Sequence, residues 1–130
     1  MTKRQVIVCF DEVKREYFPR WDIDGKWKVK FADAERCRVS TGYCDSKAAT
    51  IFLNEAVCGM TDVGVCAFLI HEICHDVAAA GHNLIWARRM ERAAKRAAVC
   101  GKAEIAEILR SDIFSYCNSV TVAAVSPGLL

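Results

Sequence analysis

The stretch HEICHDVAAAGH, residues 71–82, decides how this chain folds, and it holds all three histidines of the sequence. His71 and His75 are four positions apart, so on a helix they lie one turn apart on the same face and can bind one metal ion. Glu72 is rotated from His71 by about 100° around the same helix. Its carboxylate can therefore reach a water on the metal without binding the metal itself.

Three protein ligands and one water are the usual set at a catalytic zinc ion, and His82 is the expected third ligand. On a continuous helix, His82 would lie about 10 Å further along the axis than His75, which is too far for one ion. The helix must therefore end and the chain fold back, and Gly81 stands where this break is expected. A carboxylate on a following helix is the alternative third ligand, with three candidates: Glu91, Glu104 and Glu107.

Such a site predicts hydrolysis of a peptide bond, because zinc lowers the pKa of its water and polarises a carbonyl while Glu72 moves the proton. Two interpretations compete with this one: the motif arose by chance, or the metal is bound and Glu72 is idle. Tyr43 and Tyr116 have the right chemistry to stabilise an oxyanion, but such tyrosines are more often simply half-buried. Asp76 could orient a histidine ligand, or could instead face solvent or contact a helix.

Composition is that of one globular domain over residues 1–130, since 53% of the residues are hydrophobic. The net charge of +2 is too small to indicate a nucleic-acid or membrane partner by itself. No uncharged apolar run approaches the roughly 20 residues of a membrane-spanning helix. The N-terminal residues show no secretory signal, so we expect a cytoplasmic protein without a membrane partner.

The eight cysteines are scattered along the chain, and no two have the CxxC spacing of a structural zinc ribbon. A disulfide framework is possible in principle, but the chain is long enough to fold without one. We therefore expect free thiols that pack as small apolar groups. Cys74, inside the histidine motif, should be one of them, and Cys37 and Cys44 are the pair that is most worth checking.

Hydrophobic periodicity predicts helices and strands in an α+β arrangement. Helices are expected over 4–18, 63–80, 84–99 and 102–117, and strands over 27–31, 36–43 and 50–54. The first helix should end at Pro19, and the helix over 84–99 should bury a stripe that includes Trp86. Residues 118–130 follow as a tail, and Ser119–Leu130 carry no charged side chain.

Several short segments resemble the SprT-like metallopeptidases, a zincin family that includes the Spartan-type proteases of DNA–protein crosslink repair. They are EYFP (16–19), TIFLN (50–54), HEICH (71–75), Gly81-His82 and Trp86. The resemblance covers roughly residues 5–100. It implies a zincin-like fold, in which a small three-stranded mixed sheet packs on the HExxH helix between N-terminal and C-terminal helices. It also implies that His71, His75 and His82 bind Zn²⁺ and that Glu72 is the catalytic acid and base.

The sequence departs from the family at Asn83, where the family commonly has glycine, and it contains no C-terminal zinc ribbon. The leading hypothesis is a zinc endopeptidase that binds a protein or peptide substrate in extended form, with residues 50–54 as the expected edge strand.

Two alternatives stay open. A DNA-associated protease could contact phosphates through the basic helix that carries Arg88, Arg92, Lys95 and Arg96, unless these residues form a solvated face. A latent or non-catalytic zinc-binding module could use the uncharged tail 119–130 to block the cleft.

Overall fold

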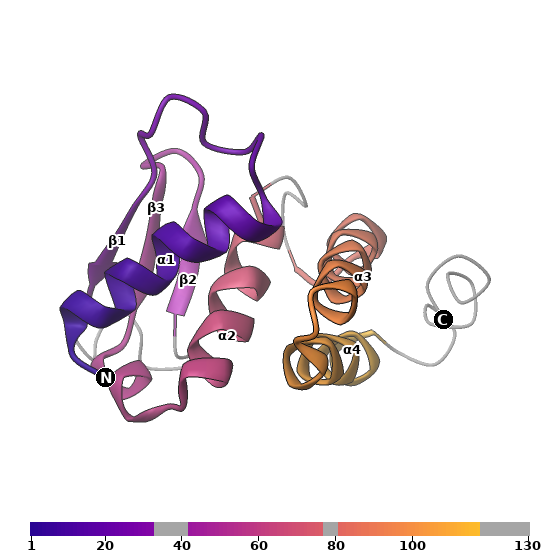
Figure 1. Ribbon diagram of the computed structural model, residues 1–130. Helices are drawn as coiled ribbons and strands as arrows, with labels where there is room; N and C mark the ends of the chain where they lie inside the picture. The colour runs from indigo at the N-terminus through magenta and orange to yellow at the C-terminus, as the bar shows by residue number, and fades with distance from the viewer. Residues whose placement is uncertain (33–41, 77–80, 118–130) are drawn as a thin grey trace.

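The structure, a computed structural model, describes residues 1–32, 42–76 and 81–117 (Figure 1). Within these ranges it has four α-helices, one 3₁₀ helix and a three-stranded mixed sheet, which confirms the predicted α+β fold. The elements in chain order are α1 (Lys3–Tyr17), β1 (Lys28–Phe31), β2 (Gly42–Asp45), β3 (Thr50–Leu53), η1 (Glu55–Gly59), α2 (Asp62–Cys74), α3 (Leu84–Val99) and α4 (Ala103–Tyr116). The predicted tail 118–130 and Cys37 lie outside the described residues.

The sheet has the strand order β1-β3-β2, with β1 parallel and β2 antiparallel to β3. The prediction that residues 50–54 form an edge strand is therefore wrong, because β3 is paired on both sides. All four residues of β3 are buried. A continuous apolar run such as Thr50–Leu53 is typical of a strand covered on both faces, whereas an edge strand more often alternates apolar and polar residues.

The strand β2 occupies residues 42–45, so it begins near the end of the predicted strand 36–43; residues 33–41 are not among those described. Gly42 opposes Leu53 in the register of the sheet. A Cβ atom at Gly42 would lie 2.5 Å from the carbonyl oxygen of Phe52 and 3.1 Å from the ring of Phe68 on α2. Glycine at this position therefore lets β2 lie close against both β3 and α2.

The helix α2 runs through the middle of the molecule, with α1 and the sheet on one side and α3 and α4 on the other (Figure 1). Every residue of α2 from Leu69 to Cys74 is buried. The amphipathic helices around it present one apolar face each. From α3 this face includes Trp86, Met90, Ala93 and Ala97, as the sequence predicts. None of the described helices is long and apolar enough to cross a membrane.

Candidate metal centre

The helix α2 places His71 and His75 at its C-terminal end. Thr61 is the N-cap of this helix, and its hydroxyl accepts a hydrogen bond from the backbone N–H of Gly64 at 3.1 Å. It ends at Cys74, so the predicted end near residue 80 is wrong. The backbone N–H groups of His75 and Asp76 donate to carbonyls three residues earlier, at 3.1 and 3.0 Å, which tightens the final turn.

The carboxylate of Asp76 anchors this final turn, because it accepts a hydrogen bond from the indole N–H of Trp21 at 2.8 Å. Trp21 follows α1 in the chain, so the contact ties the residue after the end of α2 to the segment after α1. The carboxylate of Asp76 is thus bonded to an indole and not to a histidine.

His82 lies beside His71 and His75, although residues 77–80, which separate it from them in the chain, are outside the described residues. Gly81 has φ +71°, in the left-handed region that glycine adopts without strain. Asn83 then begins α3, since its side chain accepts a hydrogen bond from the backbone N–H of Trp86 at 3.0 Å. Asn83, the departure from the family pattern, thus has a structural role as the N-cap of α3. The fold-back that the sequence required of Gly81 is present.

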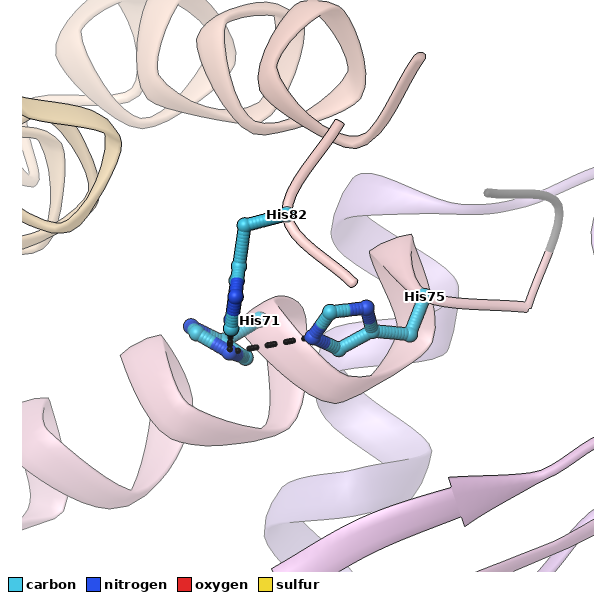
Figure 2. Close-up of side chains that lie close together, drawn as sticks. All are labelled: His71, His75 and His82. Carbon is cyan, nitrogen blue, oxygen red and sulfur yellow. Dashed lines mark hydrogen bonds between the residues drawn. The ribbon is translucent and has the colours of Figure 1, made fainter. Parts of the chain in front are cut away.

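The three imidazoles converge on one point, as Figure 2 shows. The Nε2 atom of His71 lies 3.2 Å from Nε2 of His75 and 3.1 Å from Nε2 of His82. With Zn–N bonds of 2.0–2.1 Å and tetrahedral angles, neighbouring ligand nitrogens would be about 3.3 Å apart. The two spacings from His71 therefore match those expected around a single zinc ion, and the three ligand atoms all lie within 4.8 Å of one another.

Burial lowers the pKa of two of these rings. The pKa of His75 falls to about 4, mainly through burial and also through the neighbouring His71 and His82. The pKa of His82 is lowered by burial and by His71. A metal binds the neutral imidazole, so these environments favour the form that can act as a ligand.

Two aromatic side chains hold the imidazoles in place. The ring of Trp86 packs against all three histidines, with centroid distances of 5.0, 5.7 and 4.6 Å to His71, His75 and His82. Its indole N–H also donates to the backbone carbonyl of His71 at 3.3 Å. From α4, the ring of Tyr116 stacks on His82 at 4.0 Å. The histidines therefore have a wall of aromatic rings on two sides.

Glu72 is buried beside the cluster with an exposed fraction of 4%. Among the described residues, no group gives its Oε2 atom a hydrogen bond. Burial raises the pKa of this carboxyl to about 8. A buried polar atom without a partner is costly, and a water held by a metal would supply the missing donor.

The cluster and Glu72 line an open cleft of about 1090 Å³. The segment from Gly42 to Lys47, which includes β2, forms one wall. Residues from α2 and α4 form the other, among them Phe68 and Tyr116. Tyr43 and Tyr116, the two tyrosines of interest for an oxyanion, both line this cleft, and no contact in the structure assigns that role to either.

Other candidate ligands lie elsewhere. Glu91 is buried and paired with Arg110, whose Nη2 atom is 3.0 Å from its carboxylate. Glu104 and Glu107 are exposed on α4. Cys74 is buried in the core, and burial raises the pKa of its thiol to about 12. The described cysteines are free thiols, as expected, and no cysteine among them joins the histidine cluster.

Asp112 is a neighbour of the site that the sequence did not reveal. Its Oδ2 atom lies 3.4 Å from Nδ1 of His71, and it lines the same cleft. The sequence predicts the helix that carries Asp112 but gives no sign of where this helix packs. Without a motif around it, one aspartate on an amphipathic helix cannot be distinguished from a solvated one.

The metal-free protein will lose about 2 kcal/mol of stability between pH 6.5 and 8.0. The pKa of Glu72 rises from 4.5 to about 8 on folding, so the folded state holds this proton more tightly and stability falls as the pH rises through that range. The lowered pKa of His75 acts oppositely, but only between about 4 and 6.5. Urea unfolding in the presence of a chelator measures the difference. Glu72→Gln should remove most of it, and an equal loss in both proteins would refute this assignment.

Comparison with known families agrees with these features. Residues 6–107 match the sequence model of the SprT-like family, a range that runs from α1 into the beginning of α4. No curated protein and no solved structure matches the chain. Asp112 and Tyr116, which contact the histidines from α4, lie beyond the matched range.

Proposed function

Because the chain belongs to the SprT-like family, we propose that it is a zinc-dependent endopeptidase. One observation carries this proposal: three imidazole nitrogens converge beside a buried carboxylate that has an unpartnered oxygen. A purely structural zinc site would need a fourth protein ligand. Among the described residues, the three histidines have no such fourth member in their group. This donor set supports a catalytic site, in which one position would be left for water or substrate.

The residues of the site have different roles in the proposed hydrolysis of a peptide bond. His71, His75 and His82 hold the zinc ion, which when bound supplies an acidified water and a positive charge near the substrate carbonyl. Glu72 accepts a proton from the attacking water at its unpartnered Oε2 atom and returns it to the nitrogen of the leaving amine. The raised pKa of Glu72 belongs to the metal-free site; the positive charge of a bound zinc ion would lower it and favour the ionised form that accepts the proton.

We place the substrate along β2 rather than β3. Among the described strands, β2 is at the edge of the sheet, and it forms a wall of the cleft beside the histidines. An extended peptide could add to this edge through backbone hydrogen bonds, which select for an extended conformation more than for particular side chains. Unfolded protein segments and flexible loops are thus the expected substrates.

Zinc-loaded protein should cleave casein, and 1,10-phenanthroline should reduce the rate at least about 100-fold, since both the water and the carbonyl lose their activating charge. Adding zinc back should restore cleavage. A serine-protease inhibitor, which should have no effect, controls for contaminating proteases. Cleavage that survives chelation would contradict the proposal. Zinc binding without any cleavage would favour the non-catalytic zinc-binding module instead.

Contact with DNA stays a prediction. Arg88, Arg92 and Lys95 are exposed on α3, as the hypothesis requires. The guanidinium of Arg96 lies 3.4 Å from the carboxylate of Glu16 on α1, which reduces the charge that it offers to a phosphate.

The cytoplasmic location also stays a prediction. The same holds for the proposed blocking of the cleft by the tail 119–130, which is not among the described residues.

A further inference from the structure

Both nitrogens of the His71 ring face specific partners. Nε2 lies 3.2 and 3.1 Å from the corresponding atoms of His75 and His82, whereas Nδ1 lies 3.4 Å from Oδ2 of Asp112. The His71 side chain is 10% exposed and that of Asp112 is 31% exposed. The ring is thus held between the metal position on one edge and a carboxylate on the other.

The helix α4 is well fixed, so the position of Asp112 is set by the fold. Ile105, Leu109 and Ile113 anchor α4 in the core. Two residues before Asp112, Arg110 makes two-pronged hydrogen bonds to the buried Glu91 on α3, through Nε at 3.2 Å and Nη2 at 3.0 Å. This charged pair fixes α4 against α3. The carboxylate of Asp112 is therefore presented to His71 by a rigid support.

The contact with Asp112 bears on which nitrogen of the His71 ring carries the proton. A neutral ring carries one proton, and if that proton is on Nδ1, the lone pair is on Nε2. A carboxylate accepts from Nδ1–H, so it selects this tautomer, fixes the ring plane and makes Nε2 a better donor of electrons to a metal. The ring of His75 is held differently, by a hydrogen bond to the backbone of Gly81.

We propose that Asp112 is a positioning residue of the metal centre, which acts through His71 to orient its Nε2 atom and strengthen metal binding. The inference rests on the proposed zinc site but goes beyond the family match, because Asp112 lies after residue 107. The C-terminal half of α4 then belongs to the metal centre and is more than a support for α3. A chain that ended at the matched range would lack this interaction.

The test measures zinc affinity by competition with a chelating indicator. Asp112→Ala should bind zinc about 10- to 100-fold more weakly than the original protein, the usual effect of losing such a partner. Asp112→Asn keeps the shape but not the charge, so its affinity should fall by about threefold to tenfold. Glu107→Gln, which removes an exposed carboxylate from the same helix, is the matched control and should leave the affinity unchanged.

Two further measurements separate positioning from a packing role. The visible absorption bands of the Co²⁺-substituted protein report ligand geometry, and they should shift in Asp112→Ala but not in Glu107→Gln. The stability of the metal-free protein should be nearly equal in all variants, because Asp112 is partly exposed. Zinc affinity of Asp112→Ala, or of Asp112→Asn if alanine prevents folding, within twofold of the original would overturn the inference. Absence of zinc binding by the original protein would overturn the proposed function as well.

Discussion

Replacing Glu72 with glutamine will leave zinc binding intact and reduce peptide cleavage by about 10²–10⁴-fold, the usual contribution of a general base. Glutamine has nearly the shape of glutamate, so it fills the same buried position beside the histidines. Its amide cannot accept a proton from water at neutral pH. The variant therefore removes proton transfer while keeping the three imidazole ligands.

Metal analysis measures the zinc content of the variant, and a cleavage assay on the same preparation measures its activity. Glu12→Gln, which alters an exposed carboxylate on α1, is the matched control and should keep full activity. If Glu72→Gln kept more than a tenth of the activity, Glu72 would not be the base. Loss of zinc from the variant would mean instead that the carboxylate holds the metal, which the present geometry does not support.

The second large effect concerns the third ligand: His82→Ala should weaken zinc binding by about 10²–10³-fold. Four-ligand zinc sites bind with about 10–16 kcal/mol of apparent free energy, or roughly 2.5–4 kcal/mol for each ligand. His82 lies in the loop between α2 and α3 and is partly exposed, so its loss should disturb the fold little. His71 is a poorer choice for this test, because it is buried within α2.

Calorimetric titration with zinc measures the affinity, and circular dichroism of the metal-free protein checks the fold. Ile85→Ala is the control, since Ile85 is exposed on the first turn of α3, close to His82 in the chain. A titration in which His82→Ala bound zinc as tightly as the original protein would exclude His82 as a ligand. A carboxylate would then have to be sought among residues that the cluster does not include.

Much of the helical structure could be predicted because it follows from local patterns. The helices α1, α3 and α4 begin and end within about two residues of their predicted limits, since each has an apolar stripe, and Pro19 and Gly101 follow α1 and α3. The histidine motif was equally predictable, because its spacing is a property of one helix and one glycine. These are short-range features, and the sequence displays them directly.

Features that depend on distant parts of the chain were missed. The final turn after α2 is bonded to Trp21, more than fifty residues earlier, and the central position of β3 depends on which strands pair with it. Asp112 reaches His71 because α4 packs beside α3 and α2. The hydrophobic periodicity of α4 does not indicate which of its polar residues will contact another helix. Long-range packing decided these three outcomes.

Three consecutive residues, Gly81, His82 and Asn83, have three separate roles: a left-handed backbone conformation, an imidazole in the histidine cluster and the N-cap of α3. Insertion or deletion of a single amino acid here would displace the imidazole of His82 relative to α3. Evolution can therefore exchange side chains around this loop far more readily than it can alter the loop's length. Homologous chains should align through these positions without gaps, even where the neighbouring residues have diverged.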